Sequence, residues 1–174
     1  MKRSFVIWLT GISGSGKTTL GKGLKARFKK IYGQVEFIDG EQVRDFFKND
    51  LGYTRKERIL NVKRIAFASM LIAKNGTPVI VANIAPYYEV RDFIRENIKN
   101  YMQVFLRLPL KEAIRRDTKG HYKKFKNGKM KNFIALDDNY DTPRNPDIIV
   151  DTKKHTIKES LDKIENFVRK RYKK

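Results

Sequence analysis

Hydrophobic residues occur in short continuous runs that alternate with longer stretches in which they recur every three or four positions. The continuous runs predict strands at residues 4–9, 35–38, 78–82, 101–106 and 147–151. The helical spacing predicts five helices. The first runs from residue 17 to Gly33, the second spans 54–74, the third includes Phe93 and Ile94, and the fourth spans 109–117. The last begins at a capping box at Thr156. Strands that alternate with helices and are apolar throughout predict an α/β fold, a parallel sheet covered by helices on both faces.

Two stretches do not fit this alternation. Residues 41–50 are polar and charged, and they predict no regular element. Residues 118–146 have little apolar periodicity and are too many for an ordinary connection. Long loops in compact domains often cover active sites, so we expect residues 1–174 to form a single domain with a mobile lid at about 118–146.

The first predicted strand runs into the sequence GISGSGKTT, which contains a complete G-x-x-x-x-G-K-[ST] motif between a strand and a helix. Such a loop wraps phosphates with its backbone N–H groups, and the following helix points its positive end at them. Lys17 is expected to reach the β and γ phosphates, and Thr18 to give a hydroxyl to Mg²⁺. The predicted ATP-binding residues are Gly11, Ser13, Gly14, Ser15, Gly16, Lys17, Thr18 and Thr19.

A kinase also needs an acceptor site, and in open α/β sheets ligands bind at the carboxyl ends of the strands. The second strand ends in DGEQVR, where Asp39 could accept the proton of an acceptor hydroxyl or orient Mg²⁺, and Arg44 could hold an anion. A simple turn at Asp39–Gly40 is the alternative interpretation. The third strand ends in ANIAPYYEVRD, which gives a second set of candidate residues.

These segments, together with LGYTRKERILN and RDTKGHYKKFKNGKMKNFIALDDNYDTPRNPDI, resemble the adenylyl-sulfate kinase family over residues 5–148. The resemblance implies a P-loop kinase fold with five parallel strands, usually present as a homodimer. It implies transfer of the γ-phosphate of ATP, with Mg²⁺, to the ribose 3′-hydroxyl of adenylyl sulfate. The partner is then a small nucleotide, not a nucleic acid or a membrane.

The resemblance also implies roles for single residues. Asp39 and Lys17 resemble the catalytic residues of the family. The residues that resemble its acceptor-binding set are Arg44, Tyr53, Arg58, Asn61, Lys119 and Phe133, with Tyr53 and Phe133 clamping the base and Lys119 belonging to a basic lid. The plainer alternatives are a core aromatic under the lid for Phe133 and a solvated helix charge for Arg58.

Departures from the family pattern concentrate on the acceptor side. Ala85 replaces the serine of the I-S-P segment, Asn83 replaces a usual phenylalanine, and Ile84 lies between them. Ile134–Ala135 replaces Thr-Gly, and Glu41–Gln42 replaces Asp-Asn. Because the phosphate loop shows no comparable change, the sequence favours an altered acceptor.

The altered acceptor that we expect is cytidine diphosphoramidate, which a branch of the family phosphorylates in capsular polysaccharide assembly. Bulkier residues near the base would suit its smaller ring, and Asn83 could read a pyrimidine edge. The alternative is adenylyl sulfate itself, with the substitutions as drift.

Composition changes this prediction little. The chain has 39 Lys and Arg against 19 Asp and Glu, a net charge of +20, with basic residues concentrated at 107–131 and 169–174. Either an anionic partner or a solvated surface rich in lysine would explain this positive charge. A P-loop protein that binds nucleic acid is a remote alternative, because the sequence contains no recognition motif for DNA or RNA. The chain has no cysteine and only two histidines, which argues against disulfides and a histidine metal site.

Apolar runs stay far below the ~20 residues of a membrane-spanning helix. The chain also passes from Met1–Lys2–Arg3 directly into the first strand and the glycine-rich loop, so we expect a cytoplasmic protein.

Overall fold

A computed structural model describes residues 4–172 and contains one parallel sheet. Its strands are β1 (Val6–Thr10), β2 (Glu36–Asp39), β3 (Val79–Ala82), β4 (Tyr101–Arg107) and β5 (Ile148–Asp151). Their order is β2-β3-β1-β4-β5, and all four pairings are parallel. The chain therefore places β2 and β3 on one side of β1 and β4 and β5 on the other, so the order reverses at β1. Ligand crevices in open α/β sheets form at such a reversal.

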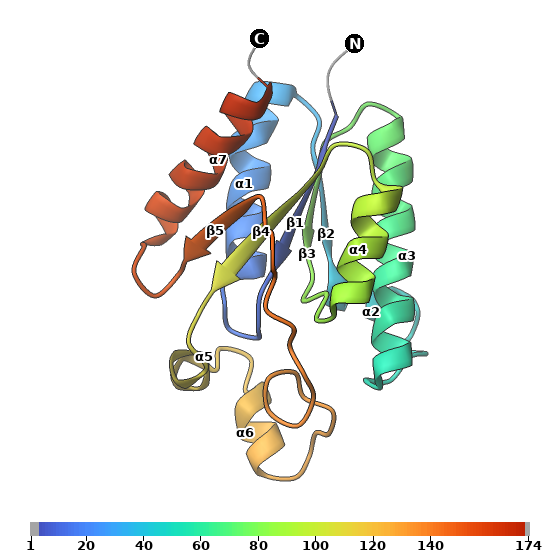
Figure 1. Cartoon of the computed structure of the whole chain (residues 1–174), viewed down its shortest axis with the longest axis vertical. Helices are drawn as coiled ribbons and strands as arrows, with labels where there is room; N and C mark the ends of the chain where they lie inside the picture. The colour runs from blue at the N-terminus through green and yellow to red at the C-terminus, as the bar shows by residue number, and fades with distance from the viewer. Residues whose placement is uncertain (1–3, 173–174) are drawn as a thin grey trace.

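Helices cover both faces of the sheet, as the sequence predicts (Figure 1). They are α1 (Lys17–Tyr32), α2 (Gly40–Phe46), α3 (Arg55–Lys74), α4 (Tyr88–Asn97), α5 (Leu110–Arg116), α6 (His121–Lys126) and α7 (Ile157–Tyr172). Alternate side chains of β1 point to opposite faces: Ile7 and Leu9 pack with α1 and α7, whereas Val6 and Trp8 pack with α3 and α4. Two apolar layers thus hold the sheet.

The long helices have the ends that their sequences predict. Thr54 and Glu57 form a reciprocal capping box at the start of α3. Thr156 and Glu159 exchange the same contacts before α7, at 3.2 Å from the Glu159 N–H to the Thr156 hydroxyl and 2.7 Å from the Thr156 N–H to the carboxylate. Helix α7 continues to Tyr172, and Lys173 and Lys174 of the basic tail lie outside the described residues.

The structure differs from the sequence prediction in two places. Residues 40–46, for which no element was predicted, form α2, because the Asp39 carboxylate accepts the Glu41 N–H at 3.0 Å and caps the helix. The segment 118–146, the predicted lid, contains the short helix α6. The Asp117 carboxylate accepts the N–H groups of Tyr122 and Lys123, at 3.0 Å each, and so supports its first turn.

The segment 118–146, called the lid segment from here on, lies beyond the carboxyl ends of the strands (Figure 1). Tyr122 and Phe133 from this segment pack with Ile12, Leu108 and Ala113 in a third apolar cluster. The lid segment is therefore packed onto the phosphate loop and α5, and its mobility stays a prediction. Across residues 4–172, every helix is too short or too polar to cross a membrane.

Candidate active site

A cavity of about 350 Å³ opens at the carboxyl ends of the strands, between the phosphate loop (residues 11–19) and the lid segment. One part of its wall, the acceptor half, follows β2 and β3: Asp39, Gly40, Glu41, Arg44, Tyr53, Arg58, Asn61, Val62, Ala82, Asn83, Ile84 and Pro86, with Phe133 and Ile134 of the lid segment. The other part, the donor half, consists of residues 13–19, Arg116, Thr118, Thr152, His155 and Ile157. Of the predicted ATP-binding residues, Gly11 alone is not in this wall.

The phosphate loop ends at a helix whose first N–H groups are available to a ligand, although within the loop the Ser15 N–H donates to the Ile12 carbonyl at 3.2 Å. Gly16, the residue before α1, has a φ of +91°, a left-handed conformation that glycine adopts without strain. It gives α1 no side-chain cap, so the first N–H groups of this helix remain free at the cavity. Unpaired N–H groups and the helix dipole together make a site for anions.

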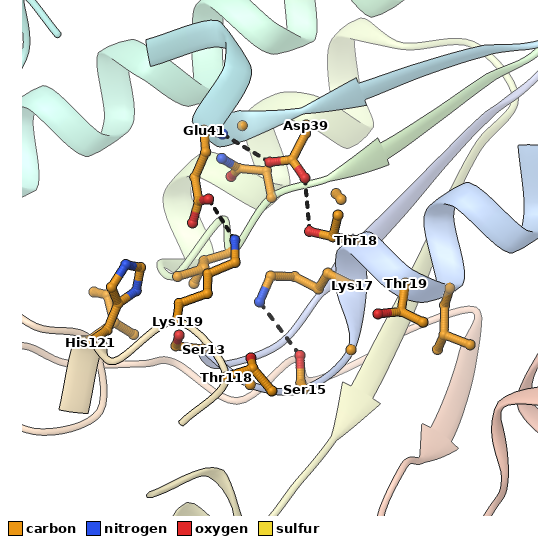
Figure 2. A pocket seen from close by; sticks show the side chains of 18 of the residues that line it. Ser13, Ser15, Lys17, Thr18, Thr19, Asp39, Glu41, Thr118, Lys119 and His121 are labelled. Atoms are coloured by element: carbon orange, nitrogen blue, oxygen red, sulfur yellow. Dashed lines mark hydrogen bonds and ion pairs between the residues drawn. The ribbon is translucent and has the colours of Figure 1, made fainter. Parts of the chain in front are cut away.

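Thr18 and Asp39 bring the two halves of the cavity into contact. The Thr18 hydroxyl donates to Asp39 Oδ2 at 2.8 Å, from the start of α1 to the end of β2 (Figure 2). These two oxygens suit Mg²⁺, which proteins often hold by one or two side chains together with phosphate oxygens. Residues 4–172 contain no cluster of three or more His, Cys, Asp or Glu side chains that could hold a metal without a phosphate ligand.

Lys17 points back into its own loop in this structure. Its Nζ donates to the carbonyl oxygens of Gly11 at 2.8 Å and Ile12 at 2.9 Å. Burial, and secondarily the nearby charge of Lys119, lowers the Lys17 pKa from 10.5 to about 7. An approaching polyphosphate would favour the ammonium form again.

Arg44 and Arg58 surround Tyr53 on the acceptor half. The guanidinium carbons lie 4.5 Å and 5.0 Å from the Tyr53 ring centroid, and the ring is 43% exposed. Arg44 donates to the carbonyls of Leu51 and Gly52 at 2.8 and 2.9 Å, which folds the loop before α3. Both arginines are buried, and burial lowers the pKa of each, although an arginine stays protonated at neutral pH.

Arg58 and Asn61 lie three residues apart on α3 and therefore face the cavity together. Asn61 is 2% exposed, and Arg58 donates from Nε to the Tyr53 carbonyl at 3.0 Å. Arg58 is thus part of the cavity wall and not a solvated surface charge.

Phe133 belongs both to the cavity wall and to the apolar cluster of the lid segment. It meets Tyr122 edge to face at a centroid distance of 4.9 Å and lies 5.9 Å from Phe125. Phe133 is therefore a core aromatic of the lid segment that also lines the cavity, and its contact with a base stays a prediction.

The segment Asn83–Ile84–Ala85 differs from its expected arrangement. Asn83 and Ile84 line the cavity, whereas Ala85 is fully buried in the cluster beside α3 and α4. The Asn83 carbonyl oxygen Oδ1 accepts the Ala85 N–H at 2.9 Å, so half of this amide is used to fold the turn. A Cβ at Gly40 would lie 2.3 Å from Asn83 Nδ2, so this close approach requires glycine.

The lid segment reaches across the cavity through Lys119. Its Nζ lies 2.5 Å from Glu41 Oε2, a contact between residues 78 positions apart, and Figure 2 shows it bridging toward α2. Tyr122 also donates to the Ser13 carbonyl at 3.1 Å, which ties the lid segment to the phosphate loop. His121 lies beside this bridge, and burial lowers its pKa.

Sequence reasoning missed several residues of the wall. They are Leu20, Gly40, Val62, Ala82, Pro86, Arg116, Thr118, His121, Met130, Thr152, His155, Ile157 and Ser160. Thr152 directly follows β5, so the rule that ligands bind at strand ends would have found it if applied to the last strand. Arg116, Thr118 and His121 fall within the RDTKGHYKK segment, which the sequence analysis used only as a family signature.

Comparison with known proteins decides the family. The model of the family described as Adenylylsulphate kinase matches residues 3–151. The chain belongs to the adenylylsulphate kinase family. It is 38% identical over 162 residues to the adenylyl-sulfate kinase of Picosynechococcus sp., covering 93% of this chain and 92% of the relative. The adenylyl-sulfate kinase of Rippkaea orientalis is 39% identical over 163 residues, covering 94% and 90%.

Solved structures of this family have the same fold. The APS kinase of Mycobacterium tuberculosis, determined in complex with AMPPNP and APS, superposes with a TM-score of 0.89 at 30% identity, covering 97% of this chain and 99% of that one. The predicted P-loop kinase fold with five parallel strands is confirmed. As a member of the adenylylsulphate kinase family, the protein is an ATP-dependent nucleotide kinase, and ATP with Mg²⁺ is the cofactor pair of the family.

Proposed function

We propose that the protein transfers the γ-phosphate of ATP to the ribose 3′-hydroxyl of adenylyl sulfate. The relatives described above are named for this acceptor, and the chain covers at least 90% of their lengths. They support adenylyl sulfate, the alternative of the sequence analysis, better than cytidine diphosphoramidate. The structural observation that carries a transfer reaction is the 2.8 Å contact between Thr18 and Asp39, which joins the donor half of the cavity to the acceptor half.

In this proposal the phosphate loop holds the donor. Lys17 turns from the Gly11 and Ile12 carbonyls toward the β and γ phosphates, and the N–H groups of α1 neutralise their charge. Thr18 and Asp39 would hold Mg²⁺, which would supply positive charge to offset that of the donor phosphates.

Asp39 also faces the acceptor half and acts on the ribose. The 3′-oxygen forms a bond to the γ-phosphorus while the bond from phosphorus to the β,γ-bridging oxygen breaks, and ADP leaves. The proton of the 3′-hydroxyl passes to the Asp39 carboxylate. Lys17 stabilises the charge on the transferred phosphoryl group.

The acceptor half orients the second nucleotide. Arg44 and Arg58 meet its anionic end, Asn61 contributes hydrogen bonds, and its base stacks between Tyr53 and Phe133. The lid segment, residues 118–146, is mobile and covers both nucleotides when Lys119 separates from Glu41.

We also propose that residues 1–174 act as one domain and that two copies form a homodimer. Sedimentation at two protein concentrations would check the homodimer.

Cytidine diphosphoramidate remains the second candidate because of Asn83. Its side chain lines the cavity, with Nδ2 close to Gly40 and with Oδ1 accepting one hydrogen bond, from the Ala85 N–H, so the amide keeps polar atoms that could read a base. Of the two enlarged residues, Ile134 lines the cavity and Ala135 does not, which weakens the argument for a smaller base.

The test is ADP release with Mg-ATP, comparing the two acceptors at equal concentrations. We expect kcat/KM to be higher with adenylyl sulfate, because the relatives that are named for this acceptor match nearly the whole chain. A wide preference for the cytidine compound would overturn the proposed acceptor and make Asn83 and Ile134 its specificity residues.

A further inference from the structure

Arg58 holds a buried charge that has one carboxylate near it. Its side chain is 10% exposed. Within residues 4–172 it forms one ion pair, with Asp138, in which Nε lies 3.8 Å from Oδ2. Its other polar contacts are backbone carbonyls, of Tyr53 to Nε at 3.0 Å and of Asn132 to Nη2 at 2.5 Å. A guanidinium removed from water needs an anion nearby, and Asp138 supplies it.

These contacts fix the plane of the guanidinium group. Nε donates to the Tyr53 carbonyl of the loop before α3, and Nη2 donates to the Asn132 carbonyl of the lid segment, whereas Nη1 makes no hydrogen bond to the described residues. Because Arg58 lines the cavity, Nη1 is the group left to meet an acceptor anion. The orientation of the arginine therefore depends on these two carbonyls and on Asp138, whose carboxylate is the anion beside Nε.

Asp138 is held at both of its carboxylate oxygens. Tyr87 donates its hydroxyl to Oδ2 at 2.6 Å, and the Asn139 N–H donates to Oδ1 at 2.7 Å. Burial and the hydrogen bond to Asp138 raise the Tyr87 pKa, so the phenol stays protonated and keeps donating.

Tyr87 is itself fixed in the core. Its side chain is 0% exposed, it precedes α4, and the Arg55 guanidinium carbon lies 4.1 Å from its ring centroid. A chain of contacts thus runs from the core through Tyr87 and Asp138 to Arg58, and from Arg58 to Asn132 in the lid segment.

We propose that Asp138 and Tyr87 are positioning residues that aim Arg58 at the acceptor and couple acceptor binding to the order of the lid segment. This inference rests on the proposed function, in which Arg58 binds the acceptor. A guanidinium aimed in advance loses less freedom when it binds an anion, so the loss of this aim should weaken acceptor binding.

The kinetic test compares Asp138→Asn and Tyr87→Phe with the wild-type enzyme. We expect the acceptor KM to rise about tenfold in Asp138→Asn, which removes the anion beside a buried guanidinium. We expect a rise of about threefold in Tyr87→Phe, which removes one hydrogen bond from the Asp138 carboxylate and leaves its charge. The KM for ATP and kcat should change by less than about twofold, because Lys17 and Asp39 are untouched. Asp162→Asn is the matched control: it removes the charge from a 2.6 Å ion pair with Arg27 between α7 and α1, outside the cavity.

A double-mutant cycle separates positioning from a structural role. If Asp138 acts through Arg58, then Asp138→Asn adds nothing to the acceptor KM in an Arg58→Ala background. Additive effects, or equal rises in the KM of ATP and of the acceptor, would overturn the inference. So would a lower Tm with unchanged kinetic constants.

Amide hydrogen exchange of residues 132–138, without any acceptor, gives a readout that does not need the substrate. We expect Arg58→Ala and Asp138→Asn to speed exchange there to a similar extent, and the double variant to add little. If the wild-type enzyme phosphorylates neither nucleotide, the proposed function fails, and this exchange measurement alone decides whether Asp138 acts through Arg58. Unchanged exchange in both variants would contradict the coupling.

Discussion

The phosphate-binding part of the cavity comes from one continuous segment, residues 13–19, whereas its acceptor half comes from segments that lie far apart in the sequence. In the first, Lys17 bonds the carbonyls of Gly11 and Ile12, six and five residues away. In the second, Arg58 bonds the carbonyl of Asn132, 74 residues away. The phosphate loop is thus built by local contacts, whereas the shape of the acceptor half depends on how the lid segment packs.

This difference separates two kinds of damage. A change in the phosphate loop or at Asp39 should impair transfer with every acceptor. A change in the acceptor half should alter which nucleotide is used and at what concentration. The predictions below test this separation, beginning with the largest effect.

Asp39→Asn should reduce kcat by about 10²–10⁴-fold, the usual range for loss of a general base. The acceptor KM should change little, because the amide is nearly the same size as the carboxylate. Asparagine is also a good helix cap, so it can still accept the Glu41 N–H that begins α2. Single-turnover measurement of ADP release with either acceptor checks this, and an unchanged Tm confirms that the fold is intact. Turnover near the wild-type value would remove Asp39 from the mechanism.

Tyr53→Leu should raise the acceptor KM about tenfold, because stacking on an aromatic ring contributes roughly 1–3 kcal/mol per base. The ring is 43% exposed and lies beside Arg44 and Arg58, so its loss also removes cation–π contacts. Steady-state kinetics with varied acceptor measures the effect, and Tyr53→Phe, which keeps the ring, is the control. An equal rise in the KM of ATP would break the distinction between the two halves.

The same distinction explains what the sequence could predict. The phosphate loop follows from a local motif, Arg44 follows from a strand end, and Arg58 and Asn61 follow from the family resemblance. Each of these residues lies in the cavity wall. The parallel sheet was equally predictable, because its strands are short apolar runs with helices between them.

The rest depended on contacts that a linear sequence does not display. The bridge between Lys119 and Glu41 requires the packed lid segment, and helix α2 requires the Asp39 side chain as a cap in an otherwise polar stretch. Ala85 was expected in the acceptor site, but the turn held by the Asn83 side chain directs it into the core. The bridge is a tertiary contact, whereas Asp39 and Asn83 each accept the N–H two residues further on, a local side-chain bond that the pattern of polar and apolar residues does not reveal.

Proton uptake on ATP binding would sharpen the comparison on the donor side. With a pKa of about 7, Lys17 is mostly neutral at about pH 8 in the free protein and should become protonated beside the phosphates. We expect an uptake approaching one proton per ATP at about pH 8 and much less near about pH 6, where the amine already carries its proton. Calorimetry in buffers of different ionisation enthalpy measures this, and Lys17→Met should abolish it.

The same shift fixes a sign for stability. Because the folded-state pKa of Lys17 is about 7, below the ordinary value of 10.5, the unfolded chain binds more protons between these two values. The free energy of unfolding therefore rises with pH through this window. Below about pH 7 the buried amine is charged, and Lys17 destabilises the folded state most. Lys17→Met should stabilise the free protein more at low pH than at high pH. The opposite order in urea unfolding would contradict the lowered pKa.

Ala135→Gly should have the smallest effect and should confine it to the acceptor half. Ala135 has a φ of +73°, a left-handed conformation that costs an L-residue roughly 1–2 kcal/mol relative to glycine. Glycine loses about 0.5–1 kcal/mol more backbone entropy on folding, so a net gain of about 0.5 kcal/mol remains. That gain should appear as slower amide exchange in the turn where the Ala135 N–H donates to the Asp138 carbonyl at 2.8 Å, with the KM for ATP unchanged.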